Sequence, residues 1–155
     1  MIELHEGVAA LLRDPEAIKV LGTADENGVP HVVRKGSLTL LDDGNVAYGE
    51  ALDSSQTNKN MVRSIWFDKT VSITVIKGDV SYQIKGRPYK CVITGPLFHE
   101  FLLRARRRKG PDADVQSVWI ITPDEVRVQT SAVRREEEAT RRPYFNRHLD
   151  RDAAL

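Results

Sequence analysis

The sequence predicts a mainly β protein with a few helices, folded as an antiparallel barrel that is closed or partly closed. Three observations predict this fold class. About seven strand-like segments lie along the chain, most of them are joined by short hairpin turns, and strands do not alternate with helices as they do in a doubly wound parallel sheet. At 155 residues the chain is long enough for one domain with one hydrophobic core.

The first third of the chain predicts one helix followed by three strands. Apolar residues at helical spacing indicate an amphipathic helix over residues 3–13, and Pro15 ends it. The Asn-Gly pair at 27–28 and the Asp-Gly pair at 43–44 indicate hairpins, because these residue types adopt the positive φ angles of tight turns. The predicted strands span residues 17–24, 30–41 and 45–51.

The rest of the chain predicts two further helices and the remaining strands. Helical patterns cover residues 55–67 and 96–109, and the second begins with proline and ends before glycine, as helices commonly do. We expect a bulge or bend at positions 87–88 and a turn at positions 123–124. Strands with alternating apolar residues are predicted over residues 70–76, 80–86, 89–95, 115–122 and 125–130.

Two segments of different character are expected. Residues 1–130 form the barrel domain, and residues 131–155 form a charged C-terminal helical arm or tail. The second segment is rich in arginine and glutamate, so we interpret it as a packing arm or a frayed tail and not as a second domain.

The composition is that of an ordinary globular protein, with 41% hydrophobic and 29% charged residues. Its 23 basic and 22 acidic residues give a formal net charge of +1, which does not indicate a nucleic-acid partner. No apolar run approaches the roughly 20 residues that span a bilayer, so no membrane partner is expected. Cys91, the single cysteine, cannot form an intramolecular disulfide, which favours a cytoplasmic location. We expect it to be a buried structural thiol.

The segment from Asp53 to Asn60 has the features of a helix N-terminus that binds an anion. Such an end presents free backbone N–H groups and about half a positive charge. Ser55 and Thr57 add hydroxyl groups, and Lys59 adds a full charge. The same residue types also cap helices that bind nothing, so the segment alone does not decide between the two interpretations.

The predicted strand around Arg34 is the second candidate. Neighbouring strand residues point to opposite faces, so Lys35 and Ser37 share one face, while Arg34 and Gly36 share the other. One basic side chain can then reach a phosphate, and the glycine lets a flat ring approach the backbone closely. A solvated edge strand protected by its charges is the alternative.

Other chemical signals are weak. The histidines are scattered without metal-ligand spacing, no hydrolase or phosphate-loop motif is present, and no residue is a candidate catalytic acid or base. We therefore predict no metal site. The basic run at 104–109 has two interpretations, a nucleic-acid grip or the solvated C-terminal end of a helix. A redox cofactor that brings its own chemistry fits this pattern.

The order of these elements resembles one known family. Residues 22–75 show a hairpin turn, a G-x-P-H strand, an Asp-Gly turn, an apolar strand, a hydroxyl-x-Lys helix start and a short alternating strand. The later segments IKGRPYKCVITGP and VWIITPDEVRV continue the match to about residue 130. The chain is similar to the pyridoxamine 5'-phosphate oxidase-like FMN-binding split barrels, and in particular to small single-domain flavoproteins of that family.

The resemblance implies an antiparallel split barrel with FMN bound at a homodimer interface, and an oxidoreductase activity. Residues near Arg34 to Ser37 would face the flavin, residues near Tyr48 to Glu50 would line it, and the start of the second helix would hold the phosphate. The implied cofactor-binding residues are Arg34, Lys35, Gly36, Ser37, Tyr48, Gly49, Glu50, Ser55, Gln56, Thr57 and Lys59.

The resemblance leaves the substrate and electron donor open. The tail, RRPYFNRHLDRDAAL, does not match the C-terminal arginine and histidine motifs of full pyridoxamine phosphate oxidases, so vitamin B6 oxidation is not implied. One alternative keeps the barrel and replaces FMN with the deazaflavin F420 or with haem. The alternative of another class is a non-catalytic barrel that binds nucleic acid through residues 104–109.

Overall fold

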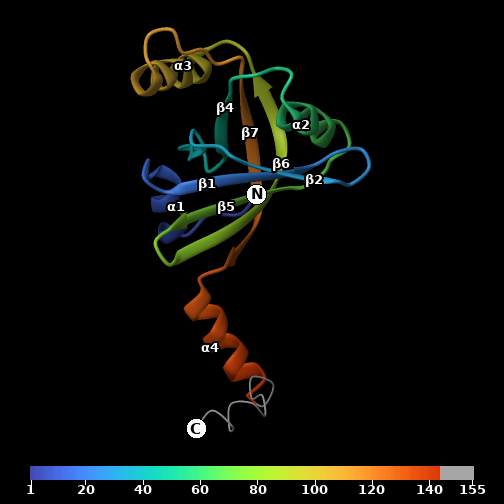
Figure 1. Ribbon diagram of the computed structural model, residues 1–155, viewed down its shortest axis with the longest axis vertical. Coiled ribbons are helices and arrows are strands. Elements are labelled where there is room, and N and C mark those ends of the chain that lie inside the picture. The colour runs from blue at the N-terminus through green and yellow to red at the C-terminus, as the bar shows by residue number, and fades with distance from the viewer. Residues whose placement is uncertain (144–155) are drawn as a thin grey trace, which may run out of the picture.

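The computed structural model describes residues 1–143 and forms one curved antiparallel sheet with helices on both of its faces (Figure 1). In this part of the chain the helices are α1 (Glu6–Arg13), α2 (Gln56–Trp66), α3 (Pro96–Lys109) and α4 (Ser131–Arg141). The strands are β1 (Ile18–Ala24), β2 (Pro30–Arg34), β3 (Thr39–Leu40), β4 (Val46–Glu50), β5 (Val71–Lys77), β6 (Val80–Val92) and β7 (Ser117–Val128). The mainly β, antiparallel class predicted from the sequence is confirmed.

The seven strands pair in the order β2-β1-β5-β6-β7-β4-β3. β6 and β7 are the longest, with 13 and 12 residues, and they join the two halves of the sheet. Their pairing shifts register between Lys85 and Gly86 and again between Pro88 and Lys90, which confirms the predicted bulge. Any Cβ on Gly86 would lie 2.5 Å from the Thr122 carbonyl oxygen, so only glycine allows the strands to approach here.

The strands predicted over residues 80–86 and 89–95 form the single strand β6, which ends at Val92. Two further predicted boundaries are wrong, and the bulge explains one of them. The turn expected at positions 123–124 is absent, because β7 continues through Pro123. Pro123 lies opposite Gly86, at the register shift where the ladder is already interrupted. A proline that has no N–H to donate is tolerated at such a position.

The other error concerns the predicted strand 30–41, which is two strands. β2 ends at Arg34, a turn follows in which the amide of Leu38 donates to the carbonyl of Lys35 (3.1 Å), and β3 begins at Thr39. β2 and β3 occupy opposite edges of the sheet. The chain therefore crosses between edges at residues 35–38, hereafter the crossing turn, and the residue alternation of one strand does not continue through it.

The core consists of two clusters on opposite faces of the sheet. Inside the curve, Leu12 of α1 and Met61 of α2 pack with strand residues such as Ile73, Ile84 and Tyr48, all of which are fully buried. Outside it, Phe101 of α3 packs against the other face of β4 and β7. Residues 46–50 of β4 therefore contact both clusters, which fixes this strand firmly between them.

Two further segments bear on the predictions. Cys91 is exposed, so the expected burial of its thiol is wrong. α4 follows β7 and extends away from the sheet in Figure 1, with no buried residue along it. The rest of the predicted tail, residues 144–155, lies outside the described residues. None of the helices within residues 1–143 combines the length and the apolar character needed to cross a bilayer.

Candidate functional site

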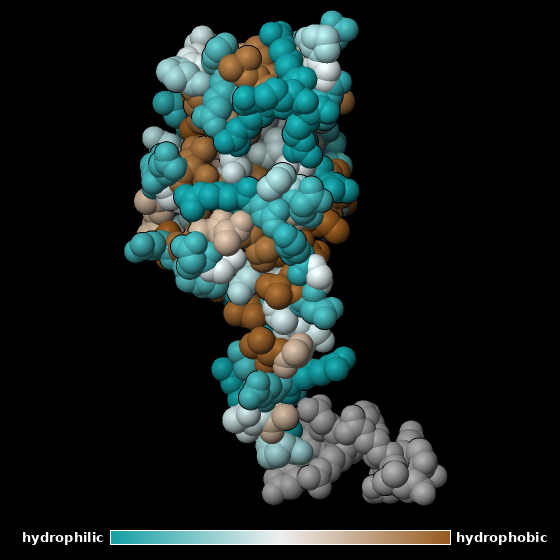
Figure 2. All heavy atoms as spheres, turned by 90° about the vertical axis from the view of Figure 1, so that its left-hand side faces the viewer, coloured by the Kyte–Doolittle hydropathy of each residue, from teal (hydrophilic) through white to brown (hydrophobic). Residues whose placement is uncertain are grey.

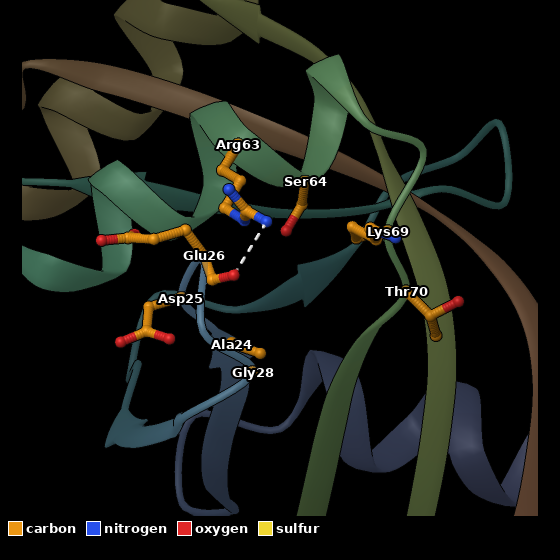
Figure 3. Close-up of a pocket in the computed structure, with 8 residues that line it drawn as sticks. All are labelled: Ala24, Asp25, Glu26, Gly28, Arg63, Ser64, Lys69 and Thr70. Carbon is orange, nitrogen blue, oxygen red and sulfur yellow. Dashed lines mark hydrogen bonds between the residues drawn. The ribbon is translucent and has the colours of Figure 1, made fainter.

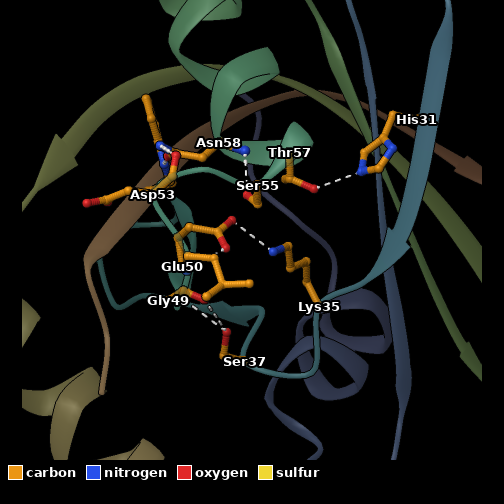
Figure 4. A network of polar contacts seen from close by, with 11 residues as sticks. His31, Lys35, Ser37, Gly49, Glu50, Asp53, Ser55, Thr57 and Asn58 are labelled. Carbon is orange, nitrogen blue, oxygen red and sulfur yellow. Dashed lines mark hydrogen bonds and ion pairs between the residues drawn. The ribbon is translucent and has the colours of Figure 1, made fainter. Parts of the chain in front are cut away.

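The candidate site lies where the start of α2, the crossing turn and the end of β4 approach one another (Figure 4). The sequence predicted all three segments as cofactor-binding. The structure shows how each one is held and which of its polar groups remain free.

The N-terminus of α2 is capped and rigidly placed. Ser55 is the N-cap, and its hydroxyl oxygen accepts a hydrogen bond from the amide of Asn58 (2.9 Å). The side chain of Asn58 donates to the carbonyl of Asp53 (2.9 Å) and accepts from the indole of Trp119 (2.9 Å), which ties the helix start to β7. The backbone amides of Gln56 and Thr57 have no acceptor within residues 1–143, so they remain available to an anion.

The inner side of α2 is fixed to the hairpin of β1 and β2. Thr57 is buried, and its hydroxyl lies 3.2 Å from Nε2 of His31. One turn further, Asn60 donates to the hydroxyl of Thr23 (2.9 Å) and accepts from Gln56 (2.8 Å). These bonds hold the helix start against the sheet.

Lys59 differs from its neighbours because its side chain is exposed. Its ammonium has no hydrogen-bond or ion-pair partner in the described part of the chain. It therefore provides a free positive charge in the first turn of α2, beside the open amides.

Lys35 is held differently. Its ammonium lies 2.8 Å from a carboxylate oxygen of Glu50, and the two side chains are only 15% and 3% exposed. The ammonium also lies 5.2 Å from the ring centre of Tyr48. The second oxygen of Glu50 accepts from the amide of Leu52 (3.3 Å). This lysine is neutralised by its own chain, so its charge is not free for a ligand.

Two other predicted residues connect the crossing turn to β4. The hydroxyl of Ser37 accepts from the amide of Gly49 (3.0 Å) and donates to its carbonyl (3.3 Å). Tyr48, next to Gly49, is fully buried in the inner cluster, and its hydroxyl has no partner within residues 1–143. Burial raises the pKa of this phenol, which stays protonated.

The remaining two predicted residues are Arg34, at the end of β2, and Gly36, in the crossing turn. Arg34 is exposed on the outer face of β2, whereas Lys35, the first residue of the crossing turn, points inward to Glu50. Gly36 lies in the crossing turn and not in a strand, and its carbonyl accepts from Arg108 of α3 (3.3 Å). The sequence prediction placed residues 34–37 on one continuous strand, and the family resemblance placed them near the flavin, whereas β2 ends at Arg34.

The site also contains residues that the sequence prediction did not include. His31 contacts Thr57, and Asn58 joins the α2 cap to Trp119. His31 could have been found, because it precedes Val33 and Lys35 at intervals of two residues and so shares their inward face. Asn58 gave no such signal, because its partner Trp119 is far away in the sequence.

A hollow lies at the other end of α2 (Figure 3). It has a volume of about 330 Å³ and lies between the β1–β2 turn and the end of the helix. Arg63 closes part of it by donating to the carbonyl of Glu26 (3.3 Å). It shares no residue with the predicted site. Nowhere in residues 1–143 do three His, Cys, Asp or Glu side chains gather in a way that could hold a metal ion.

Comparison with solved structures identifies the fold. HupZ of Group A Streptococcus is 20% identical, with a TM-score of 0.67, and the match covers 83% of this chain and 95% of that one. An FMN-binding protein of Syntrophomonas wolfei is 11% identical, with a TM-score of 0.62 and coverage of 72% and 76%. A "putative pyridoxamine 5'-phosphate oxidase" of Lactobacillus delbrueckii is 20% identical, with a TM-score of 0.58 and coverage of 81% and 93%.

Proteins described by other ligands also match, namely an F420 reductase (19% identity, TM-score 0.62) and HutZ, the heme storage protein of Vibrio cholerae (14% identity, TM-score 0.54). Neither a protein-family model nor a curated protein sequence matches the chain. The chain has the split-barrel fold of pyridoxamine 5'-phosphate oxidase-like proteins, as the sequence resemblance predicted.

Proposed function

We propose that this chain is an FMN-binding flavoprotein that acts as an oxidoreductase, with the FMN phosphate held at the N-terminus of α2. The observation that carries the proposal is the combination of two open backbone amides, at Gln56 and Thr57, with the unpartnered charge of Lys59. The fold supports it, because an FMN-binding protein is among the structural neighbours.

The residues at the start of α2 fit a phosphate, and each would bind or orient a different part of it. The amides of α2 and its dipole would bind the phosphate oxygens, and Lys59 would neutralise their charge. His31 would orient the Thr57 hydroxyl, which lies 3.2 Å from its ring. When bound, FMN supplies the redox chemistry, and the chain supplies binding and orientation.

A homodimer is part of the proposal. Leu52 and Ile93 are 64% and 70% exposed and follow β4 and β6 at the same end of the sheet, where both strands pair with β7. These two apolar side chains would be covered if a second copy packed against this end of the sheet. A second copy that covers this end would lie close to the start of α2. A monomeric mass in solution would contradict this part of the proposal.

The phosphate assignment is tested with Lys59→Ala. We expect the Kd for FMN to rise about tenfold and the Kd for riboflavin to stay unchanged, because only FMN carries the phosphate. Quenching of flavin fluorescence measures both constants. Lys69→Ala, at the opposite end of α2, is the matched control and should bind both flavins as the wild type does.

Two results would overturn the proposal. If Lys59→Ala loses affinity for both flavins equally, Lys59 does not contact the phosphate. If the purified protein is colourless and takes up no added FMN, the chain is not an FMN protein. Screening NADH, NADPH and a reduced deazaflavin for reduction of the bound flavin then identifies the electron donor.

A second candidate keeps the barrel and binds F420 or haem, and the structural neighbours with those names favour it. The absorbance spectrum of the bound species separates these cofactors from FMN. Nucleic acid has less support. Arg104, Arg106 and Arg108 contact oxygens of their own chain, so much of the basic run is already engaged. We expect no binding of a mixed oligonucleotide at low salt.

A further inference from the structure

Lys19 has a buried side chain whose ammonium has no protein partner in the part of the chain that the structure describes. It lies on β1 and is 3% exposed. Its carbonyl accepts from the amide of Lys35 (2.9 Å), but its ammonium makes no hydrogen bond or ion pair within residues 1–143. The stem of the side chain is buried, whereas Nζ is not among the fully buried atoms that lack a partner, so the ammonium still reaches solvent at the surface.

The charges that face Lys19 do not provide this partner. Arg104 and Arg108 face it from α3 and repel it, while Asp14 faces it from the end of α1. Asp14 already pairs with Lys77, and Arg104 pairs with Glu100 (2.6 Å). Burial, followed by the repulsion from Arg108, lowers the pKa of Lys19 to about 8. The local balance of charge is therefore positive.

Arg108 is held in place at this position. It belongs to the last turn of α3, and its Nη1 donates to the carbonyl of Gly36 in the crossing turn (3.3 Å). That single bond leaves the other donors of its planar guanidinium free. Figure 2 views the molecule from the left of Figure 1, the side on which α3 lies, and hydrophilic side chains cover much of its upper half.

We propose that Lys19 and Arg108, with Arg104 beside them, bind a phosphoryl group at the α3 side of the crossing turn. An arginine fork and a lysine charge together suit a phosphate dianion, and its binding would neutralise the excess positive charge beside Lys19. The site is separate from the start of α2, and the proposal does not rest on FMN binding. Inorganic phosphate or a small phosphorylated metabolite is the ligand class.

Thermal unfolding at pH 7 tests this proposal, with sodium phosphate compared against sodium chloride at equal ionic strength. We expect phosphate to raise the Tm of the wild type by at least about 2 °C. Lys19→Met and Arg108→Ala should each abolish the rise. Arg107→Ala, the neighbouring exposed arginine of α3, and Lys59→Ala, in the proposed FMN site, should keep it.

Lys19→Met also controls for folding. It removes an unpaired charge that Arg108 and Arg104 repel, so in chloride its Tm should equal or exceed that of the wild type while its response to phosphate disappears. A role of Lys19 in packing alone would predict a lower Tm in both salts.

Three results would overturn the proposal. The first is that phosphate does not raise the Tm of the wild type, and the second is that it raises the Tm of all four variants equally. The third is that only Lys59→Ala loses the rise in Tm, which would assign the phosphate to α2. Stabilisation by an oligonucleotide but not by inorganic phosphate would instead identify a nucleic-acid surface. Uptake of FMN is measured separately and fails or succeeds independently.

Discussion

Lys19 and Lys35 lie on neighbouring segments joined by a backbone hydrogen bond of 2.9 Å, yet only one of the two ammonium groups has an acidic partner. Lys35 pairs with Glu50 at 2.8 Å, and both side chains are largely buried. Lys19 is more buried than Lys35 and faces two arginines, with its nearest acid already paired to another lysine.

Lys35 therefore carries a charge that helps to hold the fold together, whereas the charge of Lys19 has no opposite charge bound to it. A compensated lysine such as Lys35 fixes the crossing turn to β4, and removing its partner should destabilise the fold. An uncompensated lysine such as Lys19 weakens the fold and is retained for another reason, which we propose is ligand binding. Variants at the two positions should therefore change stability in opposite directions.

Removal of the carboxylate partner should give the largest effect. Glu50→Leu leaves the ammonium of Lys35 buried and unpaired, so we expect a loss of about 3–5 kcal/mol in the free energy of unfolding. Urea denaturation followed by circular dichroism measures it. The double variant Lys35→Met, Glu50→Leu should recover most of the loss, because it removes both charges. A double variant as unstable as the single one would show that the pair matters by its shape and not by its charge.

Lys19→Met should have the opposite sign and a smaller size. The folded-state pKa of about 8 lies below the ordinary 10.5, so the unfolded chain binds more protons between these values. Wild-type stability should therefore rise relative to the variant from pH 8 to pH 10.5. We expect the variant to be more stable by roughly 1–3 kcal/mol at pH 7, and the gap to close near pH 10. A gap that does not change with pH would contradict an effect of charge.

Loss of the α2 cap should give the smallest change in stability. Ser55→Ala removes the acceptor of the Asn58 amide, and we expect a loss of about 1 kcal/mol in the free energy of unfolding. Ser54→Ala, next to it, is the matched control and should be neutral. If both variants behave alike, the observed cap bond adds little and the position of α2 depends on Asn58 and Trp119.

Much of the fold could be predicted from local patterns. The α3 helix was predicted over residues 96–109 and is observed over Pro96–Lys109, because proline at its first turn and glycine beyond its end mark both boundaries. The strand over 30–41 was predicted wrongly because its residues keep a β pattern while the chain crosses between sheet edges. The alternation of apolar and polar residues does not indicate which strand is the neighbour in the sheet.

The candidate site was predictable in its composition and not in its connections. Ser55 as N-cap follows from its residue type and position. The pairing of Lys35 with Glu50, and the approach of Arg108 to Gly36, do not, because they join residues 15 and 72 positions apart. Lys19 gave no signal at all, since a lysine at the start of a strand normally lies in solvent.

The sequence by itself determined the antiparallel class, most element boundaries and the helix start at residues 55–59, because these depend on side-chain period, turn residues and caps acting over a few positions. Only the tertiary structure decided which charges have partners. Curvature of the sheet brings β4 to Lys35 and α3 to Lys19, and Coulomb energy depends on distance and burial rather than on order along the chain. The same residue type therefore stabilises the fold at one position and lacks a partner at the other.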